Sequence, residues 1–169
     1  VAVIARDDAL SIGVSGPVAR ASGVDLDLRR DAQLLAYPEL APLIDVPIAT
    51  AGDIPARYRV LLAQIPVSIA LACAAADHLR ELGEGPVNVP LPKVVRVPES
   101  TSYGEFEGPL GRTGYLLSSV GEKTPWRLKL RTPSFTNVQA LARALPGTPL
   151  AALAPAVTSF FFVVGDIDR

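Results

Sequence analysis

The stretch "TGYLLSSVGEKTPWRLKLR" (residues 113–131) decides the fold class, because its apolar residues recur with a period of two. Trp126, Leu128 and Leu130 alternate with basic residues, which is the pattern of a strand with one buried and one wet face. The glycine of the 121–123 stretch favours a turn back to a strand at 113–119. The stretch therefore predicts a small antiparallel sheet.

Helical spacing appears on both sides of this sheet. After it, "SFTNVQALARALPG" (134–147) places its apolar residues on one helical face. Before it, "VLLAQIPVSIALACAAA" (60–76) is apolar nearly all round and belongs to a long helix predicted from about 55 to 82, kinked near Pro66. A helix apolar on all sides is buried in a protein core or in a membrane. We favour a core helix, because the run is shorter than the roughly 20 residues of a membrane span and contains a proline.

The N-terminal third is predicted to form two short helices followed by an ordered connection. Residues 5–13 and 16–23 each close on a glycine, and 24–53 is too apolar to be disordered. Residues 84–100 form a Pro-rich, extended crossing segment. The order of helices, sheet and helices predicts one α+β domain spanning 1–169, with a helical bundle, a long kinked core helix and a small antiparallel sheet.

Composition excludes several functions. The net charge of −1, from 16 basic and 17 acidic residues, leaves no electrostatic footprint for nucleic acid. One cysteine, Cys73, and one histidine, His78, cannot form an internal disulfide, a structural zinc site or an iron–sulfur cluster. We expect Cys73 to be inert packing and His78 to cap its helix end. The chain contains no methionine, so we expect a fragment or a processed chain.

Charged residues gather at two places. Asp25, Asp27 and Asp31 interleave with arginines, which predicts a solvated or ion-paired surface. The tail "FFFVVGDIDR" (160–169) joins an apolar run to charges, and an exposed run of this kind invites aggregation. We therefore expect 160–165 to be mostly buried and Arg169 to be engaged by a carboxylate or a carbonyl. No phosphate loop, metal-ligand pair or nucleophile elbow appears, so the residues alone indicate a domain without its own chemistry.

Five stretches in collinear order carry a family resemblance: "SGPVARASGVDLDLRRD" (15–31), "GDIPARY" (52–58), "YGEFEGPLGRTGYLLSS" (103–119), "WRLKLRTPSFTNVQAL" (126–141) and "VVGDIDR" (163–169). Together they resemble the C-terminal part of the hydrogenase-like D subunit of the proton-pumping NADH:quinone oxidoreductase, respiratory complex I. The D subunit is related to the large subunit of nickel–iron hydrogenases. The resemblance implies that this chain has the fold of that large subunit.

The resemblance also implies a place and a role. It implies a peripheral subunit on the cytoplasmic side of the cell membrane, whose C-terminus lies beside a quinone cavity and close to an iron–sulfur cluster held by the neighbouring B subunit. The chain itself would bind no cofactor or metal and supply no catalytic residue, so alone it would be inactive. Residues placed near the quinone or the cluster by resemblance are Phe161, Val163, Gly165, Arg169, Ser15, Gly16, Pro17 and Arg20.

Departures from the family pattern leave two functions open. Phe161 stands where the family carries an aspartate, and Leu61, Ala63 and Gln64 replace an arginine and two glutamates in the long helix. The chain therefore looks like a divergent paralogue. It either helps to form a quinone site within the complex, or it is a non-catalytic interaction or assembly module that keeps the fold and has lost the site. A hydrogenase is a distant third hypothesis, because nickel binding needs two Cys-x-x-Cys pairs and the chain has one cysteine.

Overall fold

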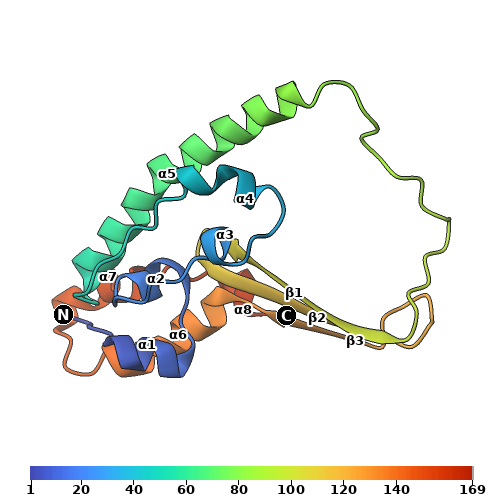
Figure 1. Ribbon diagram of the computed structural model, residues 1–169. Coiled ribbons are helices and arrows are strands. Elements are labelled where there is room, and N and C mark those ends of the chain that lie inside the picture. The colour runs from blue at the N-terminus through green and yellow to red at the C-terminus, as the bar shows by residue number, and fades with distance from the viewer. Residues whose placement is uncertain (169) are drawn as a thin grey trace.

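The computed structural model describes residues 1–168, in which short helices and one long helix flank a single antiparallel sheet (Figure 1). The α+β class is confirmed. The elements in chain order are α1 (Arg6–Ile12), α2 (Gly16–Arg20), α3 (Leu28–Asp31), α4 (Tyr37–Leu40), the 3-10 turn η1 (Ala41–Leu43), α5 (Ile54–Glu81), β1 (Ser100–Gly108), β2 (Gly111–Ser119), β3 (Arg127–Arg131), α6 (Pro133–Ala144), the 3-10 turn η2 (Leu150–Ala152), α7 (Leu153–Thr158) and α8 (Val164–Ile167).

The sheet has the strand order β1-β2-β3 with both pairs antiparallel. The register pairs Gly108 with Gly111 across a two-residue turn, and Ser118 with Arg127 at the far end of β2. The pairing of the two strands expected from the period of two is confirmed. Strand β1 was missed, because it is mostly exposed and its sequence, "STSYGEFEG", lacks the regular apolar alternation that marks a buried face.

Helix α5 is capped by Asp53, whose carboxylate accepts the backbone N–H of Ala56 at 2.9 Å, and it continues from Ile54 through Pro66 to Glu81. The expectation of a buried core helix is wrong for most of its length. One side packs on α2 and α4, and Cys73 on the remainder is exposed. Within residues 1–168, α5 is the one helix long and apolar enough to cross a membrane by length and composition, yet only 17% of its apolar window is buried.

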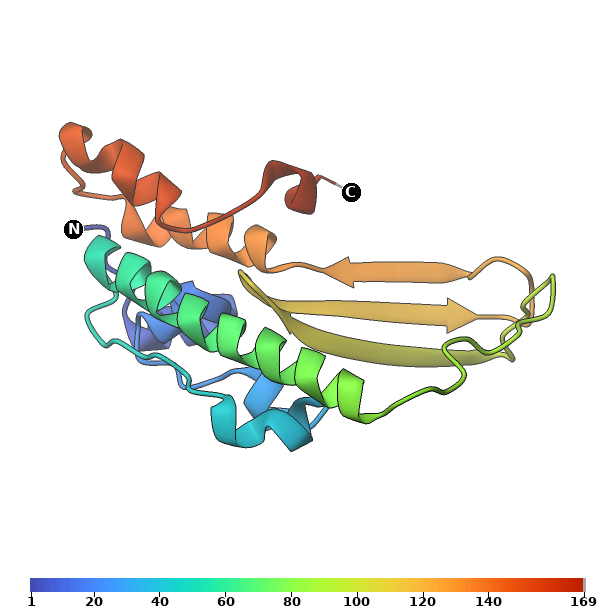
Figure 2. The ribbon, with the colours of Figure 1, turned by 90° about the horizontal axis from the view of Figure 1, so that it is seen from above.

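The main core lies between α1, α2, α6 and α7, beneath the N-terminal half of α5 (Figure 2). Its largest fully buried apolar side chain is Phe160. Residues 84–99 carry no helix or strand and arc away from this body before β1 begins.

The expectation for the C-terminal tail is half right. Phe160 is buried and Phe161 and Phe162 are partly buried, but residues 163–165 are exposed, so burial stops earlier than expected. The physical reason is that the tail leaves the core where the Val163 N–H donates to the Ser134 hydroxyl at 3.1 Å and then turns into α8 on the surface. Arg169 lies outside the described residues.

Two glycines allow the β1–β2 hairpin to approach α2 so closely that the two backbones are in contact. Gly16 has a φ of +65°, and a Cβ there would lie 2.4 Å from the carbonyl oxygen of Leu110. At Gly111, a Cβ would lie 2.5 Å from the hydroxyl of Ser15. No side chain fits at either position, so this joint fixes how the hairpin sits on the helices.

Replacing Gly16 by alanine should therefore lower the free energy of unfolding by about 3 kcal/mol, from the left-handed backbone and the overlap together. The matched control is Gly85→Ala, because nothing lies within 4 Å of a Cβ at that position. Urea unfolding of both variants is the measurement. Equal stability of the two would show that the hairpin does not press on α2 as described.

Candidate functional site

The guanidinium of Arg20, the last residue of α2, is 1% exposed and joins four parts of the fold. Its Nη1 donates to Asp27 and to Glu107, at 3.1 Å in each case, and its Nη2 donates to the Gln64 side-chain oxygen at 2.8 Å. Asp27 is the N-cap of α3, Glu107 lies in β1 and Gln64 lies on α5. One buried cation therefore ties α2, α3, α5 and β1 together.

Asp27 corrects the expectation of a solvated or ion-paired acidic surface. Its side chain is fully buried, and Arg29 covers it with hydrogen bonds of 2.7 and 2.9 Å. Burial alone would raise the pKa of Asp27, but the hydrogen bond from Arg29 and the charges of Arg20 and Arg29 outweigh it and hold that pKa below its ordinary value. Asp25 and Arg30 form the expected ion pair at the surface.

The pKa of Glu107 shifts in the opposite direction. Its side chain is 3% exposed, and burial raises its pKa above the ordinary value despite the attraction of Arg20, with the charge of Asp27 adding to the rise. The Leu28 N–H donates to its second oxygen at 3.4 Å. The cluster thus shifts the pKa values of its two carboxylates in opposite directions.

This cluster forms the polar base of a cavity of about 490 Å³ between α4, α5 and the end of β1. Arg20, Gln64 and Glu107 lie at the base, while Leu40 and Leu71 belong to its apolar wall. The two arginines and two carboxylates of the cluster balance in formal charge, so the cavity offers no net charge to attract an ion.

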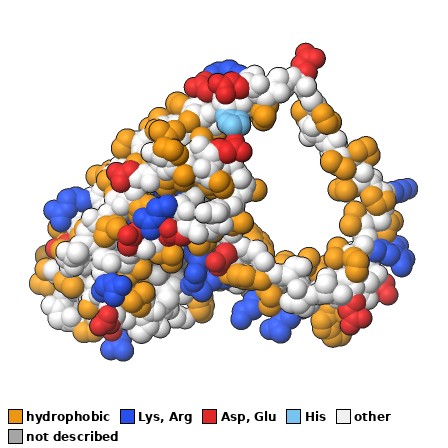
Figure 3. Space-filling view, viewed as in Figure 1, with side chains coloured by type: hydrophobic (Ala, Val, Ile, Leu, Met, Phe, Trp, Pro, Cys, Tyr) orange, Lys and Arg blue, Asp and Glu red, His pale blue; other side chains and the backbone are white. Residues whose placement is uncertain are grey.

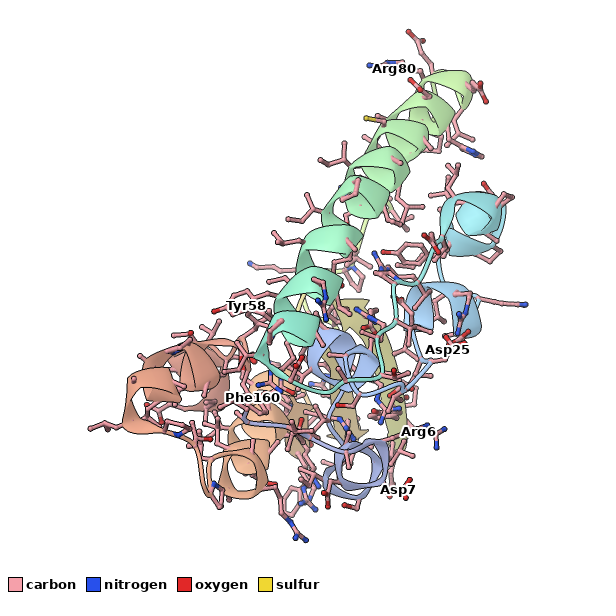
Figure 4. The ribbon with its side chains drawn as sticks, turned by 90° about the vertical axis from the view of Figure 1, so that its left-hand side faces the viewer. Arg6, Asp7, Asp25, Tyr58, Arg80 and Phe160 are labelled. Atoms are coloured by element: carbon pink, nitrogen blue, oxygen red, sulfur yellow. The ribbon has the colours of Figure 1, made fainter. Side chains whose placement is uncertain are left out.

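A second buried cation, Arg57, anchors the C-terminal tail. Its Nε donates to the Ser159 hydroxyl at 2.9 Å, its Nη1 donates to the Gly52 carbonyl at 2.7 Å, and its guanidinium carbon lies 4.3 Å from the ring centroid of Phe160. Burial lowers the pKa of Arg57 to about 10. Figure 4 shows the start of α5 meeting the tail at Tyr58 and Phe160.

Phe161 packs beside this anchor. Its ring meets that of Tyr58 edge to face at 5.2 Å, and the Tyr58 and Thr158 hydroxyls lie 3.0 Å apart. Phe161 has a φ of +48°, which costs a non-glycine residue about 1 kcal/mol. Val163 is 53% exposed, and Gly165 is also exposed. The tail therefore presents an apolar outer edge on a buried base.

The site residues named from the sequence fall into two groups that do not share a cavity. Ser15 accepts the Arg112 N–H at 3.0 Å, so Ser15, Gly16 and the buried Pro17 make the hairpin joint that leads to Arg20 and the cavity. Phe161, Val163 and Gly165 lie with α6 and α8 on the opposite side of α5 from α4 (Figure 2). None of these three tail residues lines the cavity.

Three residues of these clusters were missed as individual sites. Arg57 and Glu107 lie inside the quoted motifs "GDIPARY" and "YGEFEGPLGR", and Gln64 is a polar interruption in an apolar helix. A charged or amide side chain in such a setting is itself a signal, because it needs partners once it is buried.

Comparison with known proteins agrees with this architecture. The family described as "Respiratory-chain NADH dehydrogenase, 49 Kd subunit" matches residues 1–95 and 91–169. The chain belongs to this family. The NADH-quinone oxidoreductase D subunit 1 of Streptomyces coelicolor is 57% identical over 157 residues, which cover 93% of this chain and 41% of that protein. The corresponding D subunit 2 of Salinispora tropica is 54% identical over 171 residues, covering 100% of this chain and 43% of that protein.

Among solved structures, the chain is similar to one in "Structure of the membrane-bound sulfane sulfur reductase (MBS), an archaeal respiratory membrane complex". The TM-score is 0.87 at 30% identity, covering 100% of this chain and 46% of the other. This member of the 49 kDa family thus spans less than half the length of each of these relatives. Among its residues 1–168, no three His, Cys, Asp or Glu side chains group to hold a metal ion.

Substitution of the two carboxylates of the Arg20 cluster should change stability by different amounts. Asp27→Asn should cost about 3 kcal/mol of unfolding free energy at pH 7, because it leaves buried arginines without their counter-charge. Glu107→Gln keeps an oxygen for Arg20 and should stay within about 1 kcal/mol of wild type. Urea unfolding at pH 7 measures both, and a larger loss in Glu107→Gln would contradict the charge assignment.

The pH dependence follows from the two pKa directions. Stability from the lowered pKa of Asp27 is present above its unfolded value of 3.8 and is lost as pH falls through the folded value, so the deficit of Asp27→Asn should shrink below pH 4. Stability from the raised pKa of Glu107 is present below its unfolded value of 4.5 and is lost as pH rises through the folded value. Glu107→Gln should therefore gain on wild type as pH rises above 4.5.

Proposed function

We propose that this chain contributes one wall of a quinone site within an NADH:quinone oxidoreductase. Its relatives are named as D subunits of NADH-quinone oxidoreductase, which supports a role as a subunit of complex I. In this role the chain lies peripherally on the cytoplasmic side of the membrane. The NADH site and the redox centres belong to other parts of the complex, so the isolated chain has no turnover.

The observation that carries the proposal is the form of the C-terminal tail. Arg57 and Phe160 hold its base in the core, while Val163 and Val164 are 53% and 69% exposed. Exposure of these valines to water is unfavourable. An ordered apolar edge of this kind suits contact with a neighbouring surface or an apolar ligand. We infer that this edge faces the quinone, beside the iron–sulfur cluster of the B subunit.

Phe161 sets how such a site would hold quinone. The ring offers apolar area where the resemblance expects an aspartate, so binding gains from burial of the quinone ring and tail and receives no side-chain hydrogen bond from this position. Apolar burial contributes about 25 cal/mol per Å² before association costs are subtracted. Affinity should therefore be modest and should increase with the length of the apolar tail.

The second candidate function is a non-catalytic interaction or assembly module. Phe161 favours it, because the ring packs on Tyr58 and against the main core as an ordinary core side chain would. The similarity to a structure whose title names a sulfane sulfur reductase also shows that this fold occurs in a respiratory complex of another stated activity. In such a module the tail edge would bind a neighbouring protein surface alone.

The test replaces the matching part of the Streptomyces coelicolor D subunit 1 by this chain and measures NADH oxidation in membranes with a short-tailed quinone. An artificial acceptor that takes electrons upstream of quinone is the control reaction. We expect quinone reduction, and we expect Val163→Asp to lower it by about tenfold while the control reaction persists, because a charge at the apolar edge opposes quinone burial.

The matched control variant is Val87→Asp, because Val87 is fully exposed in the Pro-rich segment and remote from the tail. It should leave both reactions unchanged. An assembled complex that supports the control reaction but never reduces quinone would establish the non-catalytic module instead. Equal quinone reduction by Val163→Asp and wild type would contradict the assignment of the tail edge.

A further inference from the structure

Residues 84–99 connect α5 to β1, and we call them the connecting segment. All of them are exposed, although the sequence, "EGPVNVPLPKVVRVPE", is rich in valine and proline. Figure 3 shows hydrophobic side chains along the arc that this segment forms, with basic side chains among them. Contiguous exposed apolar residues of this kind mark a surface that contacts a partner.

The second half of the connecting segment has the pattern of a β-strand with one apolar face. Val89 and Leu91 are each 75% exposed, and Val95 is 50% exposed. Residues two apart lie on the same face of a β-strand, so these three side chains share one face when the segment pairs as a strand. We call residues 89–96 the docking strand.

Prolines block one edge of the docking strand. A proline has no backbone N–H, and the N–H groups of residues two apart point to the same edge of a strand. The edge of the even-numbered residues has therefore lost the donors of Pro90 and Pro92. The edge of the odd-numbered residues keeps all its donors, and within residues 1–168 no N–H of the docking strand donates to another backbone group. One edge is thus free to join a sheet.

The fold holds the connecting segment at both ends. Helix α5 ends at Glu81, directly before it, and the Ser119 hydroxyl of β2 donates to the Val97 carbonyl at 2.7 Å near its other end. A segment tethered in this way loses less conformational freedom on binding than a free peptide does. The docking strand is therefore presented to a partner in a restricted set of positions.

The family changes length at this segment. The family match falls into two parts, residues 1–95 and 91–169, which meet within the docking strand. The D subunits of Koribacter versatilis and Chloroherpeton thalassium align with all 169 residues of this chain over 194 residues, so each carries residues that this chain lacks. The break in the family match indicates that the extra residues lie here. A part that varies in length among relatives suits contact with a partner rather than maintenance of the shared fold.

We propose that the docking strand adds to the edge of a β-sheet in a neighbouring subunit of the complex. Its odd-numbered backbone groups pair with that edge, while Val89, Leu91 and Val95 pack on an apolar face of the partner sheet. Lys93 lies on the same face, so the partner carries a carboxylate opposite it. The proposal rests on the proposed function, because it requires that the chain is a subunit of a larger complex.

A membrane surface is the disfavoured occupant. Lys93 and Arg96 are balanced by Glu84 and Glu99, so the connecting segment has no net charge to attract anionic lipids. The free N–H groups of the docking strand would also find no partners in a bilayer. The edge of a sheet supplies such partners, which favours protein.

The experiment uses the Streptomyces coelicolor D subunit 1 in which this chain replaces the matching part, with an affinity tag, in membranes. A photoreactive amino acid, p-benzoylphenylalanine, takes the place of Val95 in one variant and of Val94 in the matched control. The two valines are neighbours of similar exposure, 50% and 46%, on opposite faces of the docking strand. We expect a crosslink from position 95 to one other subunit, about tenfold stronger than from position 94.

Proline substitutions test the pairing edge, with the photoreactive group at position 91 as the reporter. Val95→Pro removes an N–H from the pairing edge and should lower the crosslink about tenfold. Val94→Pro is the matched control, because it removes an N–H from the edge that prolines already block, and it should retain most of the crosslink. Val95→Ala removes side-chain area alone and should lose less of the crosslink than Val95→Pro.

Four outcomes would overturn the proposal. A crosslink from position 95 to lipid would make the membrane the occupant, and a crosslink to a second copy of the chain would make that copy the occupant. Equal crosslinking from positions 94 and 95, or none from either, would mean that no strand docks here. Quinone reduction is measured on the same membranes, so its loss with the crosslink from position 95 intact would count against the quinone site and support docking.

Discussion

The buried guanidinium of Arg20 is the constraint on which the rest of the structure depends. A cation at 1% exposure needs partners, and here Nη1 and Nη2 find theirs on α3, α5 and β1 at once, while Nε is buried without a hydrogen bond. Those elements must therefore assemble around α2 together. The close approach of Gly16 and Gly111 makes the geometry possible, because a side chain at either glycine would push the hairpin, and Glu107 with it, away from Arg20.

Two different faces of the fold matter for function, and the Arg20 cluster belongs to only one of them. One face holds the cavity above the Arg20 cluster. The other holds the tail, which Arg57 anchors and which we assign to the quinone site. Arg57 obtains its partners from a hydroxyl, a carbonyl and an aromatic face rather than a carboxylate. In the function that we propose, the chain acts as a scaffold that positions surfaces, while the redox chemistry belongs to other subunits.

How far the sequence predicts the fold depends on whether a residue's environment is local. The paired strands at 113–119 and 126–131 and the helix after them follow from apolar period alone. Strand β1 did not, because it is exposed and is held by its pairing with β2. The burial of Asp27 could not be predicted either, because it depends on Arg20 seven residues away and on Glu107 in a distant strand. The long helix was expected to be buried from its composition, but composition does not say whether its partner lies among the same residues. The tail residues could be named only through the family resemblance.

Native-state hydrogen exchange tests the central role of Arg20 most directly. The N–H groups of Ala49 and Gly52 donate to backbone carbonyls of Arg20 and Ala21, and that of Arg112 donates to Ser15, so these amides report on the joint. In wild type they should open with one common free energy. In Arg20→Met, the protection of all these amides should fall together. The amide of Leu145, the C-cap of α6, should lose less protection than they do. Separate opening energies in wild type, or a loss confined to residues next to position 20, would contradict a fold held together by this one cation.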